Sequence, residues 1–468
     1  MATRIEHDLL GDRDIPNDKY YGVHTLRALE NFPITGTPIS VYPQLINALA
    51  SVKAAAALAN HELGLLDKTR ADAIVAACKQ VQAGVAHEHF VVDVIQGGAG
   101  TSTNMNANEV IANLALEQLG HARGAYEHLH PNEHVNMSQS TTDDYPTALH
   151  IATHDLVLEL VEAMSVLRAS FERKANEFRS VLKMGRTQLQ DAVPMTLGQE
   201  FGSYAVGLAE DQARLLEALS TIREINLGAT AIGTGINTHP DYAEAARKHL
   251  AQITGIPLIT AQDLVAATPD VGAFMHISGV LKRMAAKLSK TCNDLRLLSS
   301  GPRAGMGEIN LPPMQAGSSI MPGKVNPVIP EVVNQIAYEV IGNDVTITFA
   351  AEAGQLQLNA FEPVIAHSLF KSLVHLRNGC LTLADKCVNG ITANVDHLRD
   401  NVERSIGIVT ALNPHIGYTN ATAIAQEALV SGASVYQLVL DKRLLSQEAL
   451  DEILQPEMLT QPRAVAAG

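Results

Sequence analysis

The stretch that best indicates the fold is residues 277–295, ISGVLKRMAAKLSKTCNDL. Its apolar residues recur in steps of three and four, which is the spacing of one narrow face along a helix. This face consists of Ile277, Leu281, Met284, Leu288, Cys292 and Leu295. So regular a face predicts a long helix that packs against neighbouring helices.

Helical spacing also marks four other long stretches: residues 156–178, residues 197–225, a segment after Pro330, and residues 363–387. Together they predict a mainly all-α fold with a central bundle of about five long helices. Helices of about thirty residues, against a globular mean of about eleven to twelve, bury too little of their surface in one subunit. We therefore expect subunits to associate, so that their bundles form a larger helical core.

Three domains are expected along the chain: an N-terminal, mostly helical domain (1–141), the central long-helix domain (142–396) and a small C-terminal helical domain (397–468). Glycines and prolines in the first forty residues predict an irregular lead-in with little regular structure. Alanine-rich runs from Pro43 to Gly84 predict two helices, broken near Gly64.

Composition narrows the class of partner. The chain has 468 residues, a net charge of −15 and no tryptophan. Such acidity argues against nucleic acid and membranes as partners, because both usually bind a basic surface. We expect neither a membrane span nor a signal peptide. The four cysteines are Cys78, Cys292, Cys380 and Cys387, and each lies in an apolar helical pattern. This predicts reduced thiols in the core and a cytoplasmic location.

The segment Gly317–Pro327, GSSIMPGKVNP, suits no core element. Its hydroxyls, glycines, prolines and lysine predict a mobile loop that carries reactive groups. A phosphate-binding loop is not expected, because five residues separate the glycines and Val325 follows the lysine. A second loop rich in hydrogen-bond donors is predicted between the first two long helices, before Pro194 restarts the helical pattern. It contains Arg186, Thr187, Gln188 and Gln190.

Two further segments bring hydroxyl groups to the predicted start of a helix. The glycine cluster before Thr101 forms a turn that delivers this residue to a helix start, where unpaired amides favour an anion. Ser140 is followed three residues later by Asp143, as at a helix start, so Thr141 and Thr142 gather at a second one. Together they predict a carboxylate-binding site, although hydroxyls at such places also serve as simple caps.

Four segments together resemble the fumarase/aspartase superfamily: residues 98–109, 130–143, 185–200 and 317–327. The similarity runs in order from Tyr20 to Gly417, over nearly the whole chain. It implies a three-domain subunit and a homotetramer in which each active site is assembled from three subunits at these four segments.

The resemblance also implies an activity, the reversible deamination of L-aspartate to fumarate and ammonia. In that family a loop serine, here Ser318, removes the proton at Cβ, and the β-carboxylate takes up the extra charge. Donors aimed at this carboxylate in advance lower the barrier. By resemblance they are Thr101, Ser140, Thr141 and Ser319. The remaining substrate-binding positions are Thr187, Lys324 and Asn326 for the α-carboxylate, with Gln188 adjacent and Thr142 near the amino group.

Within the superfamily the loop looks most like that of the aspartate ammonia-lyases. Val328 follows the Asn-Pro pair where fumarases carry Thr-Gln, and Gln188 stands where fumarases usually have histidine. Hydroxide needs a proton donor in order to leave, whereas a protonated amine leaves as neutral ammonia without one. Because glutamine does not titrate, the residues favour loss of an amine over loss of hydroxide.

Thr142 departs from that pattern, since aspartate ammonia-lyases generally carry asparagine there. Threonine is shorter and cannot orient an ammonium as an amide does. The alternative is a related C–N or C–O lyase that acts on fumarate with another amine, on a substituted aspartate, or with water. A purely structural role, as in lens crystallins related to this superfamily, is disfavoured by the intact loop residues Ser318, Lys324 and Asn326.

Three histidines and the family resemblance bear on metal and cofactor requirements. His128, His130 and His134 are conceivable metal ligands, but Pro131 breaks the helical face that would align them. The resemblance implies no required cofactor. Some members are activated by a divalent metal near the segment that matches His130–His134, and activation stays open for this chain. The expected ligands are L-aspartate, fumarate and ammonia.

Overall fold

The computed structural model describes residues 2–462, which divide into two compact units. Unit 1 comprises Met1–Val161, Ala213–Ala285 and Tyr338–Leu376. Unit 2 comprises Glu162–Gln212, Ala286–Ala337 and Arg377–Gly468. Each unit is thus built from three stretches of the chain, while the expected division into three consecutive domains stays a prediction.

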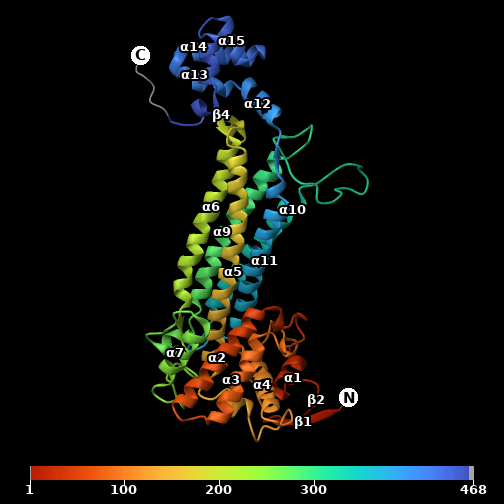
Figure 1. The fold of residues 1–468 in the computed structure, drawn as a ribbon, viewed down its shortest axis with the longest axis vertical. Helices are drawn as coiled ribbons and strands as arrows, with labels where there is room; N and C mark the ends of the chain where they lie inside the picture. The colour runs from red at the N-terminus through yellow and green to blue at the C-terminus, as the bar shows by residue number, and fades with distance from the viewer. Residues whose placement is uncertain (1, 463–468) are drawn as a thin grey trace. The chain divides into compact units, whose positions relative to one another are not determined.

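Helices make up most of both units (Figure 1). Those wholly in unit 1 are α1 (Val23–Asn31), α2 (Pro43–Glu62), α3 (Lys68–Gln82), α4 (Thr101–Gln118), α7 (Tyr242–Thr254) and α8 (Leu264–Ala267). Those wholly in unit 2 are α12 (Val395–Arg404), α13 (Val409–Ile416), α14 (Tyr418–Ser431), α15 (Val435–Asp441), α16 (Gln447–Ile453) and α17 (Pro456–Leu459). The five longest helices contribute a segment to each unit: α5 (Thr141–Glu177), α6 (Leu197–Ala218), α9 (Gly272–Leu298), α10 (Val328–Glu352) and α11 (Glu362–Lys386).

Short elements connect these helices. Antiparallel pairs are formed by β1 (Thr3–Asp8) with β2 (Gly11–Pro16), β3 (Leu182–Thr187) with β4 (Gln190–Thr196), and β7 (Ile309–Asn310) with β8 (Thr392–Ala393). The pair β5 (Glu224–Ile225) and β6 (Ile259–Thr260) is parallel. Single-turn helices are η1 (Ile39–Val41), η2 (His87–His89), η3 (Pro131–Val135), η4 (Leu219–Ile222), η5 (Val388–Gly390) and η6 (Ile406–Ile408).

The predicted bundle of long helices is confirmed, and every residue of the apolar face along α9 is buried. In unit 1, polar contacts join α9 to α10 and α10 to α11. Ser278 Oγ of α9 donates to Asp344 of α10 at 2.8 Å, and Asn343 Nδ2 of α10 donates to Ser372 Oγ of α11 at 2.9 Å. Apolar stripes therefore bring these helix segments together, and buried polar pairs fix how they face one another.

The same arrangement holds within unit 2. The rings of Phe171 in α5 and Phe201 in α6 lie 6.0 Å apart between centroids. Asn334 Nδ2 of α10 donates to Ser289 Oγ of α9 at 2.9 Å. The predicted short C-terminal helices, α13 to α17, follow in this unit around buried residues such as Leu412.

The prediction of little regular structure in the first forty residues is wrong. Strands β1 and β2 pair as a hairpin, and α1 follows them. The buried residue of β1 is Glu6, which accepts hydrogen bonds from Arg4 Nε at 2.8 Å and Val23 N at 2.9 Å. Because a buried carboxylate holds this strand, the alternation of apolar residues that normally reveals a strand is missing.

Of two further predictions of local structure, one is confirmed and one is wrong. The two helices broken near Gly64 are confirmed as α2 and α3. The donor-rich segment before α6 is a β-hairpin, and Pro194 lies within β4 instead of restarting a helix. Its two-residue turn is Gln188-Leu189, both with positive φ, which is the backbone of the tight hairpin turns usually made by Asn-Gly. Without Asn or Gly, the sequence carried no signal for this turn.

All four cysteines are buried and free of disulfides. Burial raises the pKa of the Cys78 thiol to about 12. In residues 2–462 no single helix is long and apolar enough to cross a membrane, although the bent pair α14 and α15 passes that test jointly by length and composition.

A buried carboxyl group at the start of α11 should make the stability of the fold depend on pH. Glu362 is 3% exposed, and burial raises its pKa from 4.5 to about 8. Between these two pH values the folded protein keeps this proton while the unfolded chain loses it. The contribution of Glu362 to stability is therefore present at low pH and is lost as the pH rises through this window.

Glu362→Gln keeps the size of this side chain and removes its titration. We expect the urea midpoint of the variant to fall less than that of the wild type when the pH is raised from about 5 to about 8. Glu352→Gln, at an exposed position of α10, is the matched control and should keep the wild-type slope. Equal slopes for wild type and Glu362→Gln would contradict this assignment.

Candidate active site

Thr101 occupies the first position of α4, as predicted. The preceding Gly100 has a φ of 90°, and a side chain there would collide with the ring of Tyr145. Glycine therefore allows the tight turn that opens the helix. In this turn the Thr101 hydroxyl donates to the carbonyl oxygen of Gly98 at 2.8 Å.

Ser140, Thr141 and Thr142 lie together at the start of α5, again as predicted. Asp143 Oδ1 accepts a hydrogen bond from Ser140 N at 2.9 Å, as expected of an acidic residue three positions after the start of a helix. Ser140 Oγ lies 2.9 Å from Thr142 Oγ1, and Thr142 Oγ1 donates to the carbonyl oxygen of Thr230 at 2.6 Å. The hydroxyl groups of Ser140 and Thr142 thus form a connected pair at this helix start.

Asp143 anchors this helix start to the segment around residue 230. Its second oxygen accepts from Gly228 N at 3.1 Å and from Thr230 N at 2.8 Å. Burial, aided by the neighbouring Asp144 carboxylate, raises the pKa of Asp143 to about 8. The three backbone N–H groups act in the opposite direction, because they favour the charged form.

Sequence reasoning missed the buried ammonium group of Lys53 in α2, which has no exposed side-chain surface. Its Nζ lies 2.5 Å from Asp144 Oδ2, 2.6 Å from Asn104 Oδ1, 2.9 Å from Asn136 Oδ1 and 3.0 Å from Gln139 Oε1. Burial lowers the pKa of Lys53, and the Asp144 carboxylate opposes that shift. The one available signal was a lone ionisable residue in an alanine-rich run that is otherwise typical of core.

This ammonium group ties three chain segments to α2. Asn104 belongs to α4, Asn136 and Gln139 to the segment before α5, and Asp144 to α5. The helices that begin with Thr101 and Thr141 are therefore held by one buried charge. Asn104 also donates from Nδ2 to Thr141 Oγ1 at 3.0 Å, which links the charge to a predicted site residue.

In unit 2, Thr187 and Gln188 lie exposed at the tip of the β3–β4 hairpin. Two cations of strand β3 pair with the buried carboxylate of Glu308. Lys183 Nζ lies 2.9 Å from Glu308 Oε2, and Arg186 Nη1 lies 2.6 Å from Glu308 Oε1. These ion pairs fix the hairpin to the segment that precedes the Gly317–Pro327 loop.

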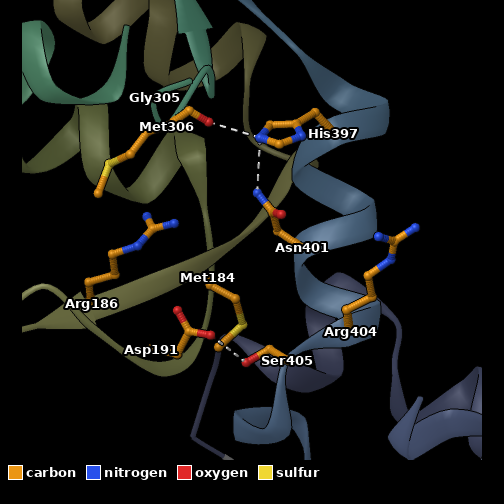
Figure 2. Close-up of a pocket in the computed structure, with 9 residues that line it drawn as sticks. All are labelled: Met184, Arg186, Asp191, Gly305, Met306, His397, Asn401, Arg404 and Ser405. Atoms are coloured by element: carbon orange, nitrogen blue, oxygen red, sulfur yellow. Dashed lines mark hydrogen bonds between the residues drawn. The ribbon is translucent and has the colours of Figure 1, made fainter. Parts of the chain in front are cut away.

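A cavity of about 340 Å³ lies beside this hairpin, between it and α12 (Figure 2). Its lining residues are Met184, Arg186, Asp191, Gly305, Met306, His397, Asn401, Arg404 and Ser405. Ser405 Oγ donates to Asp191 Oδ2 at 3.2 Å, and His397 Nε2 lies 2.8 Å from the carbonyl oxygen of Met306. Thr187 and Gln188, the predicted site residues of this hairpin, do not line the cavity.

The Gly317–Pro327 segment is an irregular loop, as predicted, and its two ends are joined. Gly317 N donates to the Lys324 carbonyl oxygen at 2.8 Å, and Asn326 Nδ2 donates to the Gly317 carbonyl oxygen at 2.9 Å. A Cβ on Gly317 would lie 2.7 Å from that Lys324 oxygen. Glycine is therefore required for the ends of the loop to meet.

Within this loop, Ser318 Oγ accepts two backbone hydrogen bonds, from Ile320 N at 3.2 Å and from Met321 N at 3.1 Å. Two N–H groups at one oxygen stabilise negative charge on it. Ser319, Ile320 and Lys324 are exposed, so the loop presents its polar groups to solvent.

The structure thus assembles the predicted residues in two groups. Unit 1 holds Thr101, Ser140, Thr141 and Thr142, and unit 2 holds Thr187, Gln188, Ser318, Ser319, Lys324 and Asn326. In residues 2–462 no group of three or more His, Cys, Asp or Glu side chains is placed to hold a metal ion. His130 Nδ1 instead accepts from the backbone N–H of Asn132 at 3.0 Å.

Comparison with known families identifies the class of protein. Residues 11–342 match the family described as Lyase, and residues 408–461 match the one described as Fumarase C C-terminus. The chain therefore belongs to the fumarase/aspartase superfamily of lyases, as its motifs indicated.

Relatives within that class carry a more specific name. Aspartate ammonia-lyase of Helicobacter pylori strain J99 is 58% identical over 98% of both chains, and that of Pseudomonas aeruginosa is 58% identical over 99% of this chain and 98% of its own. The Escherichia coli K12 enzyme of the same name is 55% identical over 98% of this chain and 96% of its own.

Solved structures agree with the fold. A Brucella melitensis protein, described as fumarate lyase:delta crystallin bound to cobalt, superposes with a TM-score of 0.96 at 55% identity, covering 98% of this chain and 100% of its own. Class II fumarase from Schistosoma mansoni has a TM-score of 0.91 at 34% identity, covering 99% of this chain and 100% of its own.

Proposed function

We propose that the chain catalyses the reversible deamination of L-aspartate to fumarate and ammonia. The observation that carries this proposal is the 55–58% identity, over nearly the whole of both chains, with relatives named aspartate ammonia-lyase. The substrate is then a small dicarboxylate. Hydroxyl groups at two helix starts and a loop with a lysine are donors of the kind that such a substrate needs.

Ser318 is the proposed base. Its Oγ takes the proton from Cβ of L-aspartate, and the electron pair of that C–H bond moves onto the β-carboxylate. The C–N bond then breaks, the double bond of fumarate forms, and the amine leaves as ammonia. The backbone N–H groups of Ile320 and Met321 support this role, because they favour the alkoxide form that a weak base such as serine requires.

We assign the hydrogen-bond donors to the two carboxylates of the substrate, which differ in whether they gain charge during the reaction. Thr101, Ser140, Thr141 and Ser319 hold the β-carboxylate, which becomes doubly negative in the intermediate. The α-carboxylate, whose charge does not change, is assigned to Thr187, Lys324 and Asn326, with Gln188 adjacent. Donors on the β-carboxylate accelerate the reaction because they interact more strongly with the intermediate than with the substrate.

We also propose a cytoplasmic homotetramer in which each site draws on three subunits. Tyr338, Val345 and Phe349 support this, because they recur at helical spacing along α10 in unit 1 and are 58%, 51% and 71% exposed. An apolar face of this kind is usually covered by another subunit. Turnover is proposed to need no cofactor.

A second candidate function rests on Thr142. Its hydroxyl proton goes to the carbonyl oxygen of Thr230 at 2.6 Å, so Thr142 can accept a hydrogen bond from an ammonium group. Because threonine is shorter than asparagine, it cannot orient that group as an amide does. A site of this kind is open to amines other than ammonia, to a substituted aspartate, or to water added to fumarate.

The deamination proposal predicts that purified, chelator-treated protein forms fumarate from L-aspartate, seen as rising ultraviolet absorbance. In the reverse direction, ammonia should add to fumarate faster than methylamine or water does. Absence of fumarate formation would overturn the proposal, and faster reaction with water or methylamine would favour the second candidate. If activity appears only after a divalent metal is restored, the proposal that turnover needs no cofactor is wrong.

Ser318→Ala should lower kcat by at least about 10³-fold, because no other group takes the Cβ proton. Its oligomeric state, measured by light scattering, should not change. Ser300→Ala is the matched control, since Ser300 Oγ also accepts a backbone N–H in a loop of unit 2, from Met306 at 3.0 Å. Near-normal turnover by Ser318→Ala would exclude Ser318 as the base.

A further inference from the structure

We propose that Asn104 is a positioning residue that reserves the hydroxyl proton of Thr141 for the substrate carboxylate. The inference rests on the proposed function and names a residue outside the predicted site. Asn104 lies on α4 one turn after its start, is 1% exposed, and contacts both Lys53 and Thr141.

The orientation of the Asn104 amide follows from Lys53. An ammonium group only donates, so the amide atom 2.6 Å from Lys53 Nζ must be the oxygen. Nδ2 then faces the other way, where it has two acceptors for its two N–H groups: Asn136 Oδ1 at 3.1 Å and Thr141 Oγ1 at 3.0 Å. The amide is fully hydrogen-bonded in this orientation and would lose its contact with the ammonium group if it turned over.

This contact fixes the role of the Thr141 hydroxyl, which has one proton and two lone pairs. Because Thr141 Oγ1 accepts a hydrogen bond from Asn104, its own proton points elsewhere. In the described part of the chain, this hydroxyl donates to no other residue. Thr141 is half-buried, so a bound carboxylate can reach that proton.

The other three predicted site hydroxyl groups of unit 1, those of Thr101, Ser140 and Thr142, have already used their protons. Thr101 donates to Gly98 O at 2.8 Å, and Thr142 donates to Thr230 O at 2.6 Å. Since the single proton of Thr142 goes to that carbonyl, the 2.9 Å contact between Ser140 and Thr142 requires Ser140 to donate. Thr141 alone among these four holds its proton ready without first breaking a hydrogen bond.

The buried charge also strengthens this donor. Hydrogen bonds in a chain polarise one another, and the chain here runs from the Lys53 ammonium through the Asn104 amide to the Thr141 hydroxyl. A carboxylate that gains charge during the reaction benefits most from such a donor. Loss of Asn104 should therefore lower kcat more than it raises KM.

Two variants of Asn104 separate proton direction from packing. Asn104→Leu removes the donor to Thr141. Asn104→Asp keeps the shape and the contact with Lys53, but its carboxylate would accept the Thr141 proton and so withdraw it from the substrate. We expect kcat to fall by about tenfold or more in Asn104→Leu and by at least as much in Asn104→Asp, with smaller changes in KM.

Asn108→Leu is the matched control. Asn108 lies one turn further along α4, is wholly buried and also donates to Asn136 Oδ1, at 3.1 Å, but has no contact with Thr141. We expect this variant to keep kcat within about threefold of the wild type, because it removes no hydrogen bond to Thr141 and so no interaction proposed to strengthen during the reaction. A loss as large as that of Asn104→Leu would reduce Asn104 to a packing residue.

A double-mutant cycle with Thr141→Val gives the decisive readout. If Asn104 acts through the Thr141 hydroxyl, adding Asn104→Leu to Thr141→Val should lower kcat by less than about twofold more. Should Asn104→Leu fail to fold, Asn104→Asp replaces it in the same cycle. Full additivity in an active wild type would overturn the role of Asn104 and leave the proposed function standing, whereas a wild type inactive on L-aspartate would overturn both.

Discussion

The constraint on which the substrate-facing part of unit 1 depends is the buried charge of Lys53. An ammonium group out of contact with water is costly unless oxygen atoms surround it. The chain supplies these oxygens from Asn104, Asn136, Gln139 and Asp144, in segments on either side of a turn and two helix starts. Satisfying one charge therefore places the starts of α4 and α5, and with them Thr101 and Thr141.

Two buried carboxyl groups fix other segments of the chain in a similar way. Asp143 binds the start of α5 to the backbone of Gly228 and Thr230, and Glu308 holds the β3–β4 hairpin through Lys183 and Arg186. Both side chains are buried, and each ties a loop or hairpin to another segment of its own unit. Buried carboxyl groups at fixed points thus hold these segments with the precision that catalytic donors need.

The fold class was accessible from sequence because long amphipathic helices leave a strong periodic signal. The face from Ile277 to Leu295 predicted a long helix correctly, and α9 spans it. The β1–β2 hairpin was missed because β1 buries the carboxyl group of Glu6 and β2 buries only Ile15. Period-2 alternation of apolar residues reveals only strands that bury several apolar side chains.

Part of the candidate site was likewise predictable from sequence, and part was not. Thr101 and Ser140 were placed at helix starts correctly, because glycines and capping residues carry local signals. Lys53 and Asn104 were missed, since their roles depend on contacts between segments distant in sequence. A lysine within an alanine-rich helix signals only that some partner must exist, and the fold decides which.

A structure of the Ser318→Ala protein with L-aspartate bound tests the central claim most directly. We predict that Thr141 Oγ1 lies about 3 Å from an oxygen of the β-carboxylate while it still accepts from Asn104 Nδ2. A β-carboxylate held by other donors, with the Thr141 hydroxyl out of hydrogen-bonding reach or turned to donate to Asn104, would contradict it.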